Sequence, residues 1–248
     1  MLLAVLADVH ANIQAFDAVW TSVRALRPDC VLLLGDIVGY NAAPRECIAL
    51  ARQCSEYVVT GNHDHDAVNE PISLGTGSGA RQVQRWTREV ISAQDAEYLR
   101  SLPKIVRIEN ELLAAHGCYL NDTHYTGYVT STMLEANLRA IAERWDVSLA
   151  FCGHTHVPMA GWLDGDICVE RPLQGLTTWP ARARAVLINP GAVGQPRDGD
   201  PRAAFALVNT ERRTIDVRRV EYDVEAACQA SAVAGLPLAL AARLRTGR

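Results

Sequence analysis

The chain has 248 residues, of which 49% are hydrophobic and 21% charged, proportions that are usual for a globular protein with a sizeable core. Its formal net charge is -4 and its lysines and arginines are scattered, so no basic stripe is available for a nucleic-acid polymer or an acidic membrane surface. The length allows one large domain or two small ones. Because no repeat, low-complexity tract or linker divides the chain, we expect a single domain over residues 1–248.

The cysteines and the N-terminal segment predict a reduced, intracellular setting. Seven cysteines make an odd number, no CxxC pair occurs, and Cys30, Cys152 and Cys168 lie in apolar runs, where a thiol behaves as a small hydrophobe. This pattern fits reduced thiols better than a disulfide framework or a zinc–thiolate site. Residues 1–7 lack the basic region of a signal peptide and are too short to span a membrane, so they predict a buried strand. We therefore expect a soluble cytoplasmic protein without a membrane partner.

Apolar runs of strand length alternate with helical patterns at the start of the chain. Strands are predicted at Leu2–Ala7, Cys30–Leu34 and Tyr57–Thr60, and helices at Ile13–Leu26 and Pro44–Cys54. This β-α-β-α-β order indicates right-handed crossovers and a buried, largely parallel sheet.

The chain changes character after a Gly/Ser/Thr loop at Gly75–Gly79. One or two helices are predicted over Ala80–Leu102, a hairpin from Lys104–Ile108 and Glu111–Ala115, a helix over Thr132–Trp145 and a strand over Leu149–Cys152. Later strands are separated by Gly, Pro and Asp; they are Met159–Leu163, Ile167–Arg171, Ala185–Ile188, Ala203–Val208 and Thr214–Val220. These predict a second, more antiparallel sheet packed on the first. The tail, Val224–Leu244, is predicted to be helical with a break at Gly235-Leu236-Pro237.

Side chains that can bind metal ions follow five of the predicted strands, at the point where each strand ends. They are Asp8 and His10, then Asp36, then Asn62, then His116, and finally His154 and His156. The carboxyl ends of strands form the ligand crevice of an open α/β sheet, so five loops should deliver these groups to one edge. Carboxylate, carboxamide and imidazole groups are all metal ligands.

Each candidate also has a plain structural interpretation. An Asp after a strand is usually a turn or capping residue, a single His such as His116 is more often structural, and Gly61-Asn62 could be only a turn because both residues tolerate left-handed backbone. These interpretations fail together, because five of the seven histidines lie at strand ends beside acidic or amide groups. The sequence therefore predicts a metal site at the carboxyl ends of the strands.

The same residues form ordered motifs. Asp8-x-His10, Gly35-Asp36, Gly61-Asn62-His63-Asp64, His116-Gly117 and Gly153-His154-Thr155-His156 resemble the full signature of the calcineurin-like metallophosphoesterase superfamily. The signature covers roughly the first three-fifths of the chain, and the segment from Asn189 to Gly194 resembles small stand-alone prokaryotic members. The resemblance implies an α/β fold: a four-layer α/β/β/α sandwich with two packed mixed sheets and the metals at one edge.

The resemblance also implies two metal sites that share one carboxylate. Asp8, His10, Asp36 and His156 would hold one divalent ion, and Asp36, Asn62, His116 and His154 would hold the other. Two ions bring more positive charge than two carboxylates and a bridging hydroxide return, which suits a phosphate anion. Ions about 3.5–4 Å apart can share a hydroxide and clamp phosphate oxygens for in-line attack.

Three further residues receive roles from the resemblance. His63 would contact phosphate or act as general acid, with Asp64 orienting and charging its imidazole. The alternative for His63 is a structural histidine behind the ligands. Asn12 resembles the position that can donate an amide to phosphate, whereas Thr155 is interpreted as a turn residue.

The segment of residues 119–131 follows a ligand-bearing strand and contains His124, Tyr125 and Tyr128. It could line a substrate pocket or be a surface loop, and the sequence does not choose between them.

Other polar residues are placed outside the site. His65 and Asp66 are interpreted as a continuation of the loop after Asp64. Arg197 and Arg202 lie in a segment where Arg and Asp alternate beside Gly and Pro, a pattern typical of a self-paired turn, so we exclude both.

The predicted activity is hydrolysis of a small phosphomonoester, phosphodiester or nucleotide polyphosphate by a metal-bridging hydroxide, without a phospho-enzyme. Alternatives are a protein phosphatase and a non-catalytic metal-binding module on the same fold. A nucleotide-binding protein with a Gly-rich phosphate loop is excluded, since neither GxGxxG nor GxxxxGK[ST] follows the first strand. Nitrogen and oxygen ligands without thiolate suit manganese most, and admit iron, zinc, cobalt or nickel. The oligomeric state stays open.

Overall fold

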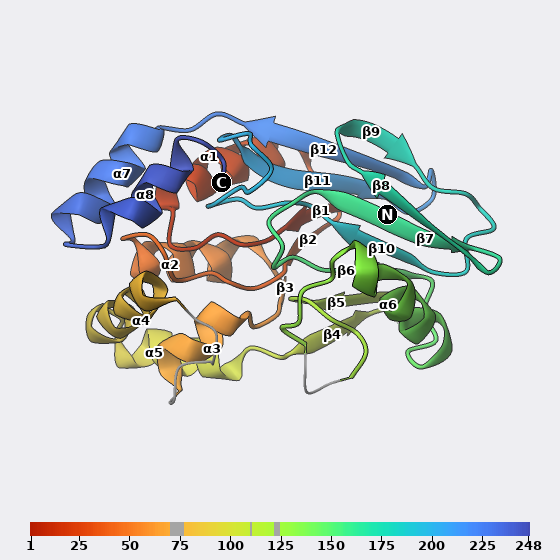
Figure 1. Cartoon of the computed structure of the whole chain (residues 1–248), viewed down its shortest axis with the longest axis horizontal. Coiled ribbons are helices and arrows are strands. Elements are labelled where there is room, and N and C mark those ends of the chain that lie inside the picture. Colours follow the sequence, from red (N-terminus) through yellow and green to blue (C-terminus); the bar gives the residue numbers. More distant parts are fainter. Residues whose placement is uncertain (70–76, 110, 122–124) are drawn as a thin grey trace.

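The computed structural model describes residues 1–69, 77–109, 111–121 and 125–248. Gly75 and Thr76 of the predicted loop Gly75–Gly79, together with Asn110 and His124, lie outside the described residues. Within them, the elements follow one another as Figure 1 shows. Their order is β1 (Leu2–Leu6), α1 (Ile13–Leu26), β2 (Cys30–Leu33), α2 (Pro44–Cys54), β3 (Tyr57–Val58), α3 (Asn62–Val68), α4 (Ser78–Val90), α5 (Ala93–Ser101), β4 (Ile105–Ile108), β5 (Leu112–Ala115), α6 (Ser131–Glu143), β6 (Leu149–Phe151), β7 (Met159–Asp164), β8 (Ile167–Pro172), β9 (Gly175–Thr178), β10 (Val186–Asn189), β11 (Ala203–Asn209), β12 (Thr214–Val220), α7 (Val224–Val233) and α8 (Leu238–Leu244).

The described strands form two mixed sheets of six. The first has the order β3-β2-β1-β11-β12-β9 and the second β4-β5-β6-β10-β7-β8. β1, β2 and β3 are parallel, as the β-α-β-α-β pattern predicts, and so are β5, β6 and β10. The carboxyl ends of both parallel sets therefore meet at one edge of the molecule.

The predicted second sheet packed on the first is confirmed, but not all of the later strands belong to it: β9, β11 and β12 lie in the first sheet. β11 pairs antiparallel with β1, placing Leu2 opposite Asn209, and β12 and β9 extend the first sheet beyond it. β7, β8 and β10 join the second sheet instead. The physical reason is burial: β11 is buried over six consecutive residues, which requires a central position with packing on both faces. β9, an exposed four-residue strand, was not predicted.

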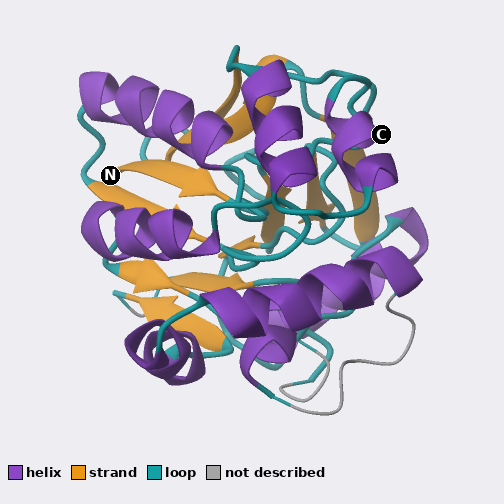
Figure 2. Ribbon diagram, turned by 90° about the vertical axis from the view of Figure 1, so that its left-hand side faces the viewer, coloured by secondary structure: helices purple, strands orange, loops and turns teal. Residues whose placement is uncertain are grey.

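The helices complete a four-layer α/β/β/α sandwich, confirming the predicted fold class. One core cluster, which includes Phe151 and Ile188, lies between the two sheets. A second packs α1 and α2 against the outer face of the first sheet through residues such as Phe16 and Ile48, and a third packs α6 against the second sheet through Leu138. In Figure 2 most of the helices stand in front of the strands.

Local signals set the ends of several helices. Asn12 caps the N-terminus of α1, because its side chain accepts a hydrogen bond from the amide of Ala15. Asp223 caps α7 in the same way by accepting from the amide of Ala226. Gly235, at a φ of 69°, separates α7 from α8 as predicted. No helix in the described part of the chain combines the length and apolar character needed to cross a membrane.

Isoleucine substitutions test the contribution of the core between the sheets. Ile188→Ala should lower the free energy of unfolding by about 2–5 kcal/mol, because Ile188 is fully buried and its loss leaves a cavity. Ile167→Ala is the matched control: Ile167 is 68% exposed, so the change should stay within about 0.5 kcal/mol. Urea unfolding of both variants measures the difference. Equal losses would contradict the assignment of Ile188 to the main core.

Candidate metal centre

The predicted ligands lie at the ends of five strands and converge. Asp8 follows β1, Asp36 follows β2, Asn62 begins α3 after β3, His116 follows β5, and His154 and His156 follow β6. All except Asn62 are buried, at 7% exposure or less, and so is His10. Both sheets contribute to this edge.

Several of these residues have a left-handed backbone conformation, which residues other than glycine rarely adopt. The φ angles are 55° at Asp8, 49° at His10, 53° at Asp36, 67° at His154 and 61° at His156. Hydrogen bonds between neighbouring loops hold this conformation, including one from the amide of His10 to the carbonyl of Asp36 at 2.8 Å. Such conformations cost about 1–3 kcal/mol each, and they cluster at functional sites.

The first group of candidate ligands contains His10, His156 and Asp8, and the acceptor nitrogens of its two imidazoles face each other. His10 and His156 each direct Nδ1 at a backbone carbonyl, that of Val38 at 3.2 Å and that of Gln195 at 2.5 Å. Each Nδ1 must therefore donate, which leaves both Nε2 atoms as acceptors, 3.1 Å apart. Asp8 Oδ1 lies 3.4 Å from Nε2 of His156. Three acceptors pointing at one another suit a cation between them.

The second group has the same character. Nδ1 of His116 donates to the carbonyl of Leu34 at 2.7 Å, so its Nε2 is again an acceptor. That atom lies 2.9 Å from Nδ1 of His154 and 3.2 Å from Oδ1 of Asn62. Backbone carbonyls that orient imidazoles in this way are typical of metal-binding histidines.

Asp36 lies between the two groups. Its Oδ1 accepts a hydrogen bond from the amide of His63 at 2.9 Å. Its Oδ2 lies 3.5 Å from Nε2 of His10 and 3.4 Å from Nε2 of His116. One oxygen thus fixes the carboxylate while the other faces both groups. The ligand atoms are nitrogen and oxygen throughout, a set that fits divalent transition metals.

Burial and the charges of neighbouring residues raise the pKa values of some candidate ligands and lower those of others. Burial raises the pKa of Asp8 to about 7, assisted by the nearby charge of Asp36. Burial also opposes ionisation of Asp36, but the imidazoles of His116 and His63 hold its pKa well below the usual value. Burial disfavours the charged form of His116, yet Asp36 and Asp8 raise its pKa to about 9. Burial lowers the pKa of His154 to about 3.

His63 lies beside the ligands, and its imidazole has a partner that the sequence did not reveal. Nε2 of Gln84 lies 2.7 Å from Nδ1 of His63, so Nδ1 accepts and the neutral ring carries its proton on Nε2. The Tyr40 ring packs against it with centroids 4.5 Å apart. Gly39 is required there, because an added Cβ would overlap the His63 ring. Burial lowers the pKa of His63.

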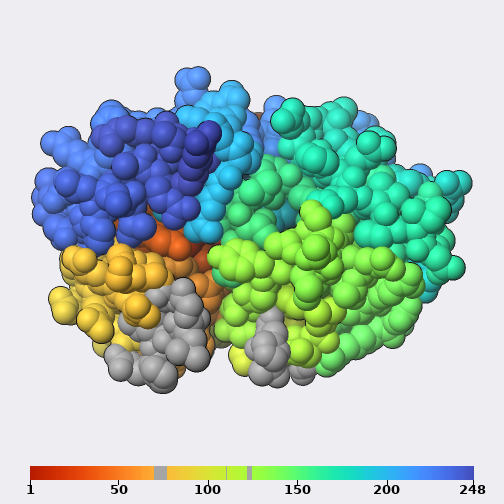
Figure 3. Space-filling model, viewed as in Figure 1, coloured from red at the N-terminus to blue at the C-terminus, as the bar shows by residue number. Residues whose placement is uncertain are grey.

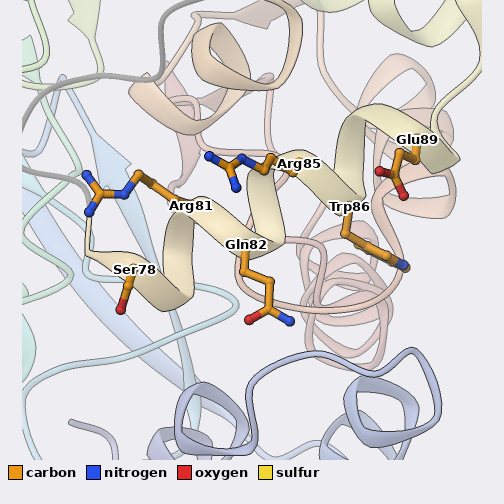
Figure 4. Close-up of a pocket in the computed structure, with 6 residues that line it drawn as sticks. All are labelled: Ser78, Arg81, Gln82, Arg85, Trp86 and Glu89. Atoms are coloured by element: carbon orange, nitrogen blue, oxygen red, sulfur yellow. The ribbon is translucent and has the colours of Figure 1, made fainter.

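Gln84 comes from the buried face of α4, and no motif marks it in the sequence. The opposite face of the same helix lines an open cavity with Ser78, Arg81, Gln82, Arg85, Trp86 and Glu89. Figure 4 shows these side chains along α4. The cavity contains none of the predicted site residues.

Two predicted roles are corrected by the hydrogen bonds. Asp64 does not contact the His63 imidazole; its carboxylate accepts from the amides of Val38 at 3.1 Å and Gly61 at 3.0 Å, joining the loop of Asp36 to that of Asn62. Asn12 caps α1 with its oxygen, and its nitrogen donates to the carbonyl of Gly194 at 2.9 Å. Asn12 therefore caps α1 and braces the loop of Gly194 behind the candidate ligands.

The two arginines that the sequence analysis excluded from the site differ in the structure. Arg202 pairs with Asp200 at 2.7 Å, as the turn pattern predicted. Arg197 does not: Nη2 donates to Gln195 Oε1 at 3.1 Å and to the Tyr40 hydroxyl at 3.3 Å. Excluding Arg197 was wrong, because it turns inward toward residues that contact the ligands.

Three other expectations about loops can be compared with the structure. His65 and Asp66 belong to α3 rather than to a loop; Asp66 is buried and His65 is exposed. Tyr128, from the segment of residues 119–131, stacks on His154 with ring centroids 3.9 Å apart. Part of that segment therefore borders the ligands. The turn role of Thr155 is confirmed, since its backbone amide donates to the carbonyl of Gly153 at 2.8 Å and its hydroxyl accepts from the side-chain amide of Asn189 at 3.0 Å.

Metal affinity should rise with pH because protons compete for two ligands. Asp8, with a pKa of about 7, and His116, with a pKa of about 9, must both be deprotonated to bind metal. We expect binding to release about two protons at pH 6 and about one at pH 8. Calorimetry in buffers of different ionisation enthalpy counts these protons. Affinity that is independent of pH, without proton release, would contradict the assignment.

Comparison with known proteins agrees with this geometry. Residues 1–213 match the profile of the calcineurin-like phosphoesterase superfamily domain. The chain is 30% identical to the uncharacterized protein MJ0912 of Methanocaldococcus jannaschii, over 100% of this chain and 98% of that protein. The crystal structure of a metallophosphoesterase from Sphaerobacter thermophilus superposes with a TM-score of 0.86 at 34% identity, covering 100% and 99% of the two chains.

A more distant structure shares the fold. The hypothetical protein PH1004 from Pyrococcus horikoshii OT3 superposes with a TM-score of 0.79 at 21% identity, covering 100% of this chain and 98% of its own. The resemblance inferred from the motifs is thereby confirmed over most of the chain. The chain belongs to the calcineurin-like phosphoesterase superfamily and is a metal-dependent phosphoesterase.

Proposed function

We propose that the chain hydrolyses a small soluble phosphoester at a centre of two divalent metal ions. The observation that carries this proposal is the placement of Asp36 Oδ2 between Nε2 of His10 and Nε2 of His116. Each of these imidazoles belongs to a separate group of facing acceptors, so one carboxylate oxygen is available to both. A shared carboxylate is what two ions held close together require.

The composition of the ligand set favours an anionic substrate. Two of the seven ligands, Asp8 and Asp36, are carboxylates, while Asn62 and the four histidines bind without adding negative charge. The centre would therefore stay positive when loaded. Two such ions polarise the phosphoryl group and activate the attacking water.

His63 is positioned to serve the leaving group. Gln84 fixes Nδ1 as an acceptor in the neutral ring, so Nε2 carries the proton and can donate a hydrogen bond to a phosphate oxygen. When the imidazole is doubly protonated, a rotated Gln84 amide can accept from Nδ1, because its Oε1 has no hydrogen-bond partner among the described residues. Gln84 can thus support both protonation states of a general acid.

The cysteines bear on the cellular compartment, and the candidate ligands bear on the identity of the metal. The seven cysteines are all unpaired, which supports a reducing compartment, and we propose the cytoplasm. Carboxylate and carboxamide ligands suit manganese, and imidazole suits iron, zinc and nickel, so we propose manganese as the ion to test first.

The dinuclear proposal is tested through the shared carboxylate. Asp36→Asn removes the only carboxylate that faces both groups in the described structure, so metal retention should fall for both sites together. Asp8→Asn is the matched comparison, because the Asp8 carboxylate faces Nε2 of His156 and meets His154 through the backbone amide rather than the imidazole, so its loss should affect chiefly one ion. Elemental analysis after dialysis measures the content. Retention of one normally bound ion in Asp36→Asn would show that Asp36 does not bridge.

The role of His63 is tested by the leaving group. His63→Gln should keep the metal content and lower turnover by roughly 10²–10⁴-fold, the usual range for a positioned acid or base. The loss should be largest for alkyl phosphates and smaller for nitrophenyl phosphate, because a stable leaving anion needs little protonation.

His65→Gln is the matched control, since the exposed His65 lies two residues further along α3 and should tolerate the change. An equal loss on aryl and alkyl substrates would assign His63 to phosphate binding instead. Loss of a metal ion would place it among the ligands.

A further inference from the structure

Two tyrosines lie against the candidate metal ligands, one on each group. The Tyr40 ring meets His10 edge-on, with centroids 4.5 Å apart and an interplanar angle of 62°. The same ring packs against His63 at 4.5 Å, so Tyr40 is enclosed by the site. The Tyr128 ring instead stacks on His154, with centroids 3.9 Å apart and an interplanar angle of 23°. One face of Tyr128 is therefore covered by a candidate ligand.

The other side of Tyr128 is open to solvent. The side chain is 50% exposed, although one face of its ring lies on His154. Among the large hydrophobic side chains that the described residues leave exposed, Tyr128 is the only aromatic one. Others, such as Ile167 and Leu176, belong to β8 and β9, which carry no candidate ligand. The open aromatic surface is thus found beside the candidate metal centre.

The backbone on both sides of Tyr128 is held in place. The amide of Gly117 donates to the carbonyl of Tyr125 at 2.7 Å. A Cβ added at Gly117 would overlap the carbonyl oxygen of Gly127, so the two segments touch. On the other side, Val129 is buried in the core cluster that packs α6 against the second sheet. A ring fixed in this way loses little freedom when a ligand packs on it, which favours binding.

His154 places the ring of Tyr128 beside the position of an ion without blocking it. Nδ1 of His154 lies 2.9 Å from Nε2 of His116, so this nitrogen faces the second group of candidate ligands. An imidazole binds a metal ion through a nitrogen lone pair in the plane of its ring. Tyr128 covers a face of the imidazole and leaves that plane free. Figure 3 shows light green atoms of the segment leading into α6 at the surface of the face in view.

We propose that Tyr128 is the stacking surface for a planar aromatic group of the substrate, whose phosphoryl group the metal centre binds. The substrate class is then a phosphoester of an aromatic alcohol or of a nucleoside. The inference rests on the proposed function, because the phosphoryl group at the metal ions brings its organic group to Tyr128. A flat ring covers the whole open face of a tyrosine, whereas a puckered ring touches it through a few atoms only.

The alternative role for Tyr128 is to shield His154, which is only 7% exposed, from water. Two substitutions separate shielding from stacking. A phenylalanine keeps the ring and can do both. A leucine still covers the imidazole with apolar atoms but offers no aromatic face to a ligand.

Ligand binding tests the stacking surface without relying on turnover. Manganese-loaded protein is titrated calorimetrically with phenylphosphonate and cyclohexylphosphonate, which are similar in size, are not esters and differ in that only the phenyl ring is flat. The ratio of their two Kd values is compared between variants, which cancels intrinsic differences between the ligands. From wild type to Tyr128→Leu, the preference for phenylphosphonate should fall about fivefold or more, as expected for one aromatic stacking contact. Tyr128→Phe should keep the preference, and the metal content should be unchanged in both variants.

Tyr98→Leu is the matched control, because Tyr98 belongs to α5 and its ring lies under the guanidinium of Arg52, at 4.4 Å. This variant should keep the wild-type preference. A preference for phenylphosphonate that survives in Tyr128→Leu would overturn the proposal. Equal weakening of both phosphonates in Tyr128→Leu would also overturn it, because that result would assign Tyr128 to the shielding of His154.

A further titration identifies the source of the planar group. A nucleoside phosphonate, in which carbon replaces the ester oxygen, is compared with phenylphosphonate in the wild type and in Tyr128→Leu. Tighter, Tyr128-dependent binding of the nucleoside phosphonate would support a nucleotide substrate. Tighter, Tyr128-dependent binding of phenylphosphonate would support a simple aryl ester.

Hydrolysis assays distinguish failure of this inference from failure of the proposed function. If the metal-loaded chain hydrolyses neither aryl, alkyl nor nucleoside phosphoesters while Tyr128-dependent binding of phenylphosphonate persists, the proposed function is rejected and the stacking surface is kept. If phosphoesters are hydrolysed while the preference for phenylphosphonate does not depend on Tyr128, the stacking surface is rejected and the proposed function is kept.

Discussion

The carboxylate of Asp36 is the contact on which the rest of the site depends. One oxygen is fixed by the amide of His63, and the other faces His10 and His116 from the two halves of the ligand set. A carboxylate can do this only if the loops after β1, β2, β3 and β5 all approach within a few ångströms. The two packed sheets make that approach possible, because the carboxyl ends of their parallel strands open at the same edge.

Close approach of the loops demands unusual backbone and small residues. An added Cβ at Gly61 would overlap the Asp36 carboxylate, and one at Gly35 would overlap the backbone of Gly61. Asp36 itself is held at a φ of 53°. This strain is offset by the fully buried sandwich beneath it, which includes Phe151 and Ile188, and by Asp64, whose carboxylate joins the two loops. The fold therefore supplies the rigidity that a preorganised site requires.

Charge is distributed in two zones. Next to the ligands, neutral imidazoles and Asn62 keep the centre from being neutralised. Further out, the Arg197 guanidinium donates to Gln195 and Tyr40, and no carboxylate of the described residues lies within 4.0 Å of it, whereas Arg182 on the surface is paired with Asp164. Tyr40 belongs to both zones, since its ring packs on His10 and its hydroxyl bonds to Arg197.

The sequence by itself determined the class of fold, the alternation of the first strands and helices, and the seven candidate metal ligands, because each candidate follows an apolar strand in a short motif. It did not determine the pairing of β11 with β1 or the partners of His63, Asp64 and Asn12. These depend on which side chains of distant segments come within hydrogen-bonding distance, and no local pattern encodes that distance. Arg197 shows the limit most clearly: its neighbours suggest a self-paired turn, and only the packing of the loop after β10 against Tyr40 brings its guanidinium beside the site.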